Sequence, residues 1–92
     1  MPTATTNLAI PSVHANGTSK GALIQQLSDA WDALEAARTA LRQAAPNGRD
    51  YYPQGPDAIE QATAQHLDRL RRIDGVQDEL QEMMRMIDEQ GR

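Results

Sequence analysis

The amino-acid sequence predicts an all-α fold, an antiparallel, coiled-coil-like hairpin of two amphipathic helices. Two segments, 19–45 and 56–90, place apolar residues at alternating spacings of three and four, the heptad pattern of a helix with one buried face. The segment between them, 46–55, is rich in proline and glycine, which favour turns. The 92 residues include one Trp, two Tyr, no Phe and no Cys. This composition disfavours a β-sandwich core and excludes a disulfide framework.

The first helix is expected to run from about Ser19 to Ala45. Ser19 suits the N-cap, because its hydroxyl can accept a hydrogen bond from an otherwise unpaired amide of the first turn. Pro46 ends the helix, since the residue before a proline disfavours the α region. Trp31 widens an apolar stripe that consists of Leu23, Leu27, Ala30, Leu34, Ala37, Leu41 and Ala44.

The second helix is expected to run from about Pro56 to Gln90. Proline suits the first helical position, and Asp57 and Glu60 place negative charge at the positive end of the helix dipole. The seam positions again alternate by four and three, and they are Ile59, Thr63, His66, Leu70, Ile73, Gln77, Leu80, Met84 and Ile87.

Residues 1–18 are expected to form a flexible arm. The segment carries no charged side chain and shows no helical or alternating period. Its sparse apolar residues, Leu8, Ile10 and Val13, could dock on an exposed groove. Chain ends are usually loose unless they are tied down, which favours the flexible arm.

Folding the helices back on each other is expected to bring Leu23 near Leu80, and Trp31 near Leu70 and Ile73. The last two turns of the second helix then extend beyond the start of the first, where either the arm or another chain must cover them. We expect the charges to support this pairing. The expected contacts are Asp29 and Asp32 with Arg71 and Arg72 between helices, and Asp68–Arg72 and Arg85–Glu89 within the second helix.

Self-association is expected because one hairpin buries one seam, whereas both helices carry wider apolar faces. Two hairpins can bury the remaining faces in a four-helix or larger homo-oligomeric bundle. Gln77 could specify the register across such a dimer. The predicted oligomer interface consists of Leu27, Trp31, Leu34, His66, Leu70, Ile73, Leu80, Met83, Met84 and Ile87.

The inter-helix segment is the candidate binding loop. Helix hairpins are usually joined by about 2–8 residues, and this connection is longer. Tyrosine and arginine are enriched where proteins bind each other. The predicted partner- or ligand-binding residues are Arg49, Asp50, Tyr51, Tyr52 and Gln54. The structural alternative is that a tyrosine closes the open end of the hairpin, and we expect one tyrosine to pack and the other to be displayed.

No catalytic residue, metal site or cofactor is predicted. The positions three and four residues from His66 hold Ala62, Thr63, Arg69 and Leu70, which are poor metal ligands, so His66 is expected to be structural. The net charge of −4 disfavours nucleic-acid binding, and no apolar run approaches the length that crosses a membrane.

The run Ala-Pro-Asn-Gly-Arg-Asp-Tyr-Tyr-Pro-Gln-Gly at 45–55, followed by Gln65-His66 and Arg69-Leu70, resembles a group of small proteins encoded by bacteriophages and prophages. The resemblance covers about residues 23–90. It implies an accessory phage protein in the bacterial cytoplasm that acts against a host factor or a defence system. These proteins have no assigned activity, so the resemblance transfers no role to a single residue.

Three functional hypotheses follow. The first is a homo-oligomeric hairpin that binds a protein partner through the loop. The second is a protein that sequesters a nucleotide or another small ligand between protomers, with Tyr51 or Tyr52 stacking on a base and Arg49, with Arg42, holding phosphate. The third is a structural component of a phage.

Overall fold

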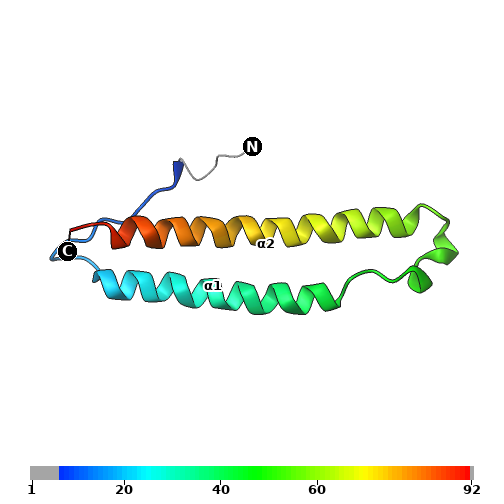
Figure 1. The fold of residues 1–92 in the computed structure, drawn as a ribbon, viewed down its shortest axis with the longest axis horizontal. Coiled ribbons are helices and arrows are strands. Elements are labelled where there is room, and N and C mark those ends of the chain that lie inside the picture. Colours follow the sequence, from blue (N-terminus) through cyan, green and yellow to red (C-terminus); the bar gives the residue numbers. More distant parts are fainter. Residues whose placement is uncertain (1–6, 92) are drawn as a thin grey trace.

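The computed structural model describes residues 7–91 and is a helical hairpin (Figure 1). Helix α1 (Lys20–Gln43) and helix α2 (Ala58–Asp88) run antiparallel, and two short 3-10 helices, η2 (Gly48–Asp50) and η3 (Tyr52–Gln54), lie in the loop between them. The molecule is a rod with extents of 61 × 26 × 16 Å. The predicted all-α hairpin is therefore confirmed.

Helix α1 begins where a polar side chain can satisfy its first turn. The Ser19 Oγ accepts a hydrogen bond from the Ala22 amide at 3.1 Å, which is the N-cap expected from the sequence. At the other end the Ala44 amide donates to the Leu41 carbonyl at 2.9 Å. The helix stops at Gln43, two residues before the expected end, and Pro46 prevents its continuation.

Helix α2 begins at Ala58, two residues later than the sequence pattern indicates. Pro56 and Asp57 form a turn before the helix, and the Asp57 side chain makes no capping hydrogen bond. Glu60 provides the negative charge of the first turn. The helix continues without interruption to Asp88.

Polar contacts fix the register of the two helices. The Gln77 Nε2 donates to the Trp31 carbonyl at 3.3 Å and to the Glu35 Oε1 at 3.1 Å. The Arg38 Nε lies 2.6 Å from the Asp74 Oδ1. Gln77 therefore specifies the register inside one hairpin, whereas the sequence analysis suggested this role across a dimer.

The register differs from the expected one, and the expectation that α2 projects at its C-terminal end is wrong. Trp31 lies opposite Gln77, about a turn beyond the expected partners Leu70 and Ile73. Lys20 reaches the end of α2, and the two helices finish close to level there (Figure 1). At the loop end, α2 extends past the end of α1 (Figure 1). The physical reason is the set of polar contacts made by Gln77, Arg38 and Lys20, and the loop spans the resulting overhang of α2 (Figure 1).

The expected ion pairs are found only in part. Within residues 7–91, Arg38–Asp74 is the ion pair between the helices, and Asp29 and Asp32 form none. Within α2, the pairs Asp68–Arg72 and Arg85–Glu89 are present as predicted. The ion pairs expected between the helices are absent because the observed register moves Arg71 and Arg72 away from Asp29 and Asp32.

Few side chains in the described part of the chain are fully buried. Ile87 is 0% exposed, Gln77 5% and His66 6%, and all three lie on α2. The other residues of the predicted oligomer interface are half-buried, and they are Leu27, Trp31, Leu34, Leu70, Ile73, Leu80, Met83 and Met84. The hairpin thus uses this stripe for its own seam without covering it completely.

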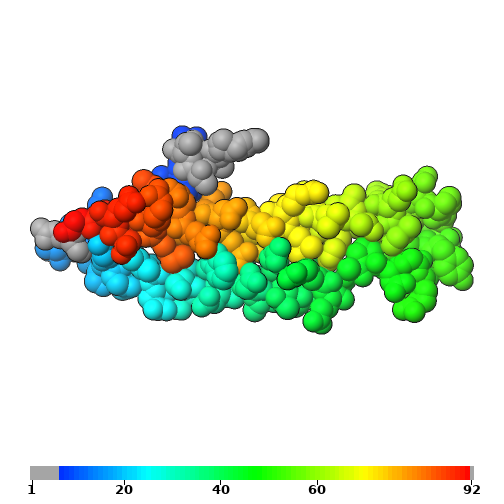
Figure 2. Space-filling view, in the orientation of Figure 1, coloured from blue at the N-terminus to red at the C-terminus, as the bar shows by residue number. Residues whose placement is uncertain are grey.

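The described part of the arm, residues 7–18, lies along the last turns of α2 (Figures 1 and 2). The Gln90 Oε1 accepts from the Val13 amide, and the Gln90 Nε2 donates to the Pro11 carbonyl, both at 2.7 Å. Leu8 and Ile10 are half-buried, as is Val13. The structure therefore gives residues 7–18 defined contacts, where the sequence pattern indicated a flexible arm. Residues 1–6 of that arm lie outside the described part.

Lys20 connects the start of α1 to the end of α2. Its Nζ donates to the Asp88 carbonyl at 2.8 Å and to the Gln90 carbonyl at 2.7 Å. The Asp88 carbonyl belongs to the last turn of α2, where helix carbonyls have no partner inside the helix, and Gln90 follows the end of that helix. The ammonium group also lies at the negative end of the α2 dipole, which favours a cation.

Candidate interaction surface at the inter-helix loop

The loop has a defined backbone built from consecutive turns. The Asn47 Oδ1 accepts from the Arg49 amide at 2.9 Å, and the Asn47 carbonyl accepts from the Asp50 amide at 2.9 Å. A second turn follows, in which the Gln54 amide donates to the Tyr51 carbonyl at 2.9 Å. Asparagine favours such turns because its short side chain bonds to the backbone two residues on. The loop therefore presents its side chains from a fixed backbone.

Gly55 redirects the chain from η3 into α2. Its φ of 108° and ψ of 166° lie in a region that only glycine adopts without strain. The Gly55 carbonyl accepts from the Ala58 amide at 3.3 Å, which leads into the first turn of the helix. The position of η3 against α2 depends on this residue.

The two tyrosines divide their roles as expected. Tyr51 is half-buried and lies over the start of α2, where it lines a hollow of about 240 Å³. Tyr52 is 77% exposed, the highest value among the large apolar side chains of the described part. One ring thus anchors the loop, and the other is available to a partner.

The hollow beside Tyr51 is uncharged. Its other lining residues are Gln54, Ala58, Gln61, Ala62 and Gln65. Of the predicted loop residues, the structure brings together Tyr51 and Gln54, whereas Arg49, Asp50 and Tyr52 do not line the hollow. Sequence reasoning missed Gln61 and Gln65. Their spacing of four residues on one face of the second helix, beside the loop, is the signal that could have identified them.

Arg49 and Asp50 are exposed neighbours without a structural role in the loop. Within residues 7–91 their side chains form no hydrogen bond and no ion pair with each other or with the helix ends. Arg49 therefore does not cap the carbonyls of α1, which was the structural alternative for this residue. Both charged groups are accessible on the same loop as Tyr52.

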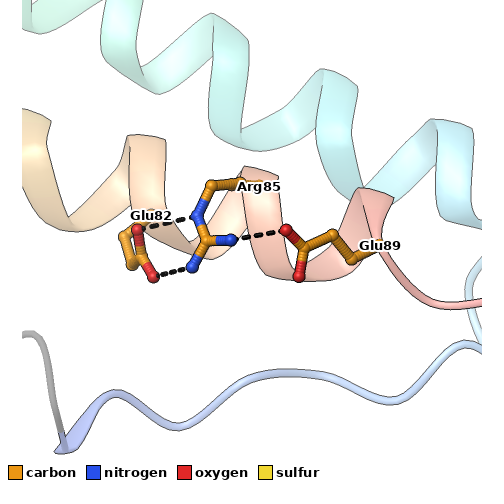
Figure 3. A network of polar contacts seen from close by, with 3 residues as sticks. All are labelled: Glu82, Arg85 and Glu89. Atoms are coloured by element: carbon orange, nitrogen blue, oxygen red, sulfur yellow. Dashed lines mark hydrogen bonds and ion pairs between the residues drawn. The ribbon is translucent and has the colours of Figure 1, made fainter.

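A charged network lies on α2 at the opposite end of the rod. Figure 3 shows Arg85 between Glu82 and Glu89, with the arm passing on the side of α2 away from α1. The hydrogen bond from Arg85 holds the pKa of the Glu82 carboxyl below its ordinary value, and the same bond raises the pKa of Arg85. All three side chains are solvated, so the network contributes little to stability.

Nothing in the described residues indicates a metal centre or a membrane span. Within residues 7–91, no group of three His, Cys, Asp or Glu side chains lies close enough to hold a metal ion. His66 is 6% exposed on α2, which agrees with a structural position. Neither α1 nor α2 combines the length and the apolar character that a bilayer crossing requires.

Comparisons with known protein families, with curated proteins and with solved structures give no match to this chain. The functional interpretation therefore rests on the structure of the loop. A fixed backbone that displays an aromatic ring beside a guanidinium and a carboxylate can bind another macromolecule by burying the ring and pairing the charges.

Proposed function

We propose that this chain is a small accessory interaction protein of the bacteriophage type. It self-associates and binds a host or phage protein in the bacterial cytoplasm, and one such partner is a bacterial defence factor that it inhibits. The observation that carries the binding role is the 77% exposed Tyr52 on a loop whose backbone is fixed by hydrogen bonds. Binding a large, rigid aromatic ring loses little side-chain entropy, which favours tight binding.

Self-association is supported by how little the hairpin buries. Ile87 is the one fully buried apolar side chain in residues 7–91, and most residues of the seam remain half-exposed. Domains of this size rarely gain more than about 3–5 kcal/mol from a single core. A second copy would remove further apolar surface from water and add stability that one hairpin lacks.

The geometry supports nucleotide sequestration less well. A phosphate needs a cation at the site, but the hollow beside Tyr51 has an uncharged lining and Arg49 lies outside it. A thermal-shift screen with nucleotides separates the two hypotheses, because a specific ligand raises the melting temperature by mass action. The partner-binding hypothesis expects no shift.

The direct test is affinity capture from bacterial lysate with the double variant Arg49→Ala/Tyr52→Ala. We expect the wild type to retain a defined protein that the variant loses, because both side chains are accessible and neither supports the fold. The matched control is Asp29→Ala/Gln81→Ala, which removes two exposed side chains far from the loop and should retain the same protein. Equal recovery by wild type and loop variant would contradict the proposal.

A further inference from the structure

The first turns of α2 carry an apolar hollow on their outer surface. Its volume is about 350 Å³, and it is lined by Ile59, Glu60, Thr63, Ala64 and Leu67. Four of these residues have the spacing i, i+3, i+4 and i+7, from Glu60 to Leu67. In coiled coils, four residues of one helix in this arrangement form the hole that receives a side chain of the facing helix. The hollow therefore has the residue arrangement that receives a side chain from a second helix.

The same surface also carries a side chain that fits such a hole. Leu67 is an aliphatic residue with 45% of its surface exposed, and it borders the hollow. At this end of the rod α2 extends past the end of α1 (Figure 1), so α1 does not reach the first turns of α2. In a two-fold interface both copies use the same patch, so that patch must carry both a protruding side chain and the hollow that receives it. This surface carries both.

We propose that a second copy of this chain docks on this surface, with the two α2 helices antiparallel and Leu67 of each copy in the hollow of the other. This inference rests on the proposed self-association and names its surface. Placing Leu67 over residues 63 and 64 of the second copy puts the two-fold axis between residues 65 and 66. Arg71 of one copy then lies opposite Glu60 of the other.

The charges agree with this antiparallel arrangement. Glu60 and Arg71 are both exposed, and within residues 7–91 neither forms an ion pair. The two-fold axis brings these opposite charges together twice, once on each side of the leucines. A parallel arrangement in register would instead place Glu60 against Glu60 and Arg71 against Arg71, which repel. The charge pattern is thus complementary to itself in this antiparallel orientation and repulsive in the parallel orientation in register.

The first experiment compares Leu67→Glu with the matched control Val76→Glu by sedimentation equilibrium over a range of concentrations. Val76 is also 45% exposed on α2, but nine residues, or about 2.5 turns, place it on the opposite side of the helix. We expect Leu67→Glu to raise the dimer dissociation constant at least about tenfold, and Val76→Glu to change it by less than about threefold. Circular dichroism of both variants checks that the helices are retained.

The second experiment reverses the charges. Glu60→Arg and Arg71→Glu are each expected to raise the dissociation constant by about three- to tenfold, because each variant creates two like-charge contacts. The double variant restores both pairs and should return to within about twofold of the wild type. If the wild type is monomeric at every concentration, the proposed self-association fails. If the wild type is dimeric but insensitive to Leu67→Glu, only the assigned surface fails, and absence of rescue overturns the antiparallel register.

Discussion

Replacing Gln90 with alanine is expected to release the arm from α2. The Gln90 side chain is bonded to the arm backbone twice, through the Val13 amide and the Pro11 carbonyl, and both bonds are part-buried. An alanine leaves both backbone groups without this partner while the packing of Ile10 and Val13 remains. The variant therefore isolates the contribution of the two hydrogen bonds.

The magnitude follows from the two bonds. A hydrogen bond of this kind contributes a net ~0.5–1.5 kcal/mol, so the pair contributes about 1–3 kcal/mol. This free energy corresponds to an acceleration of hydrogen exchange at the Val13 amide by about 5- to 150-fold, if exchange requires release of the arm. A loss of about 1 kcal/mol or more should also lower the melting temperature of a domain of this size by about 4 °C or more.

Hydrogen exchange followed by NMR measures the effect at Val13 directly. The matched control is Gln81→Ala, which removes the same amide from an exposed position where the side chain makes no hydrogen bond in the described part of the chain. Exchange at Val13 should be unchanged in the control. If Gln90→Ala also leaves Val13 exchange unchanged, the arm is not held by Gln90 and the reasoning fails.

Three further outcomes are expected. Ile87→Ala should lower the free energy of unfolding by about 2–5 kcal/mol in denaturant titration, because this side chain is 0% exposed; a loss below 1 kcal/mol would contradict its burial. Gly55→Ala should lower the free energy of unfolding by about 1–3 kcal/mol in the same assay, because φ at this position is 108°. The control Gly48→Ala changes a position without positive φ and should lower it by less than ~1 kcal/mol. In an NMR titration the Glu82 carboxyl should titrate below its ordinary pKa of 4.5, and Arg85→Gln should return it toward that value. Because the folded-state pKa of Glu82 is lowered, its contribution to stability is present above the unfolded pKa and is lost as the pH falls through the folded pKa. An unchanged titration of Glu82 in Arg85→Gln would refute the role of this pair.

The local features of the fold could be predicted because each depends on neighbours in the sequence. The heptad stripes identify two helices, the Ser19 hydroxyl caps the first of them, and Pro46 ends it. The pair Asp68–Arg72 follows from a spacing of four residues. The division of roles between Tyr51 and Tyr52 could also be anticipated, because a long loop beside an open hairpin end can bury one ring and leave the next exposed.

The register could not be predicted, because a heptad stripe faces its partner equally well after one helix slides along the other. Three contacts determine it here: Gln77 with the Trp31 carbonyl, Arg38 with Asp74, and Lys20 with the end of α2. None of them has a periodic signature in the sequence. The arm contacts were missed for a related reason, since Gln90 recognises backbone atoms and any residue supplies those.

Lys20 also affects the order in which the helices can form. It is the first residue of α1, and the first turn of that helix contains no acidic side chain. A cation at the start of a helix opposes the helix dipole, so Lys20 weakens the helix to which it belongs and strengthens the one that it reaches. A peptide of residues 19–45 alone should therefore fray at its beginning. In the whole chain that turn is stabilised only when α2 packs against α1. Formation of the hairpin is therefore more cooperative than the helix propensities of the two separate segments would suggest.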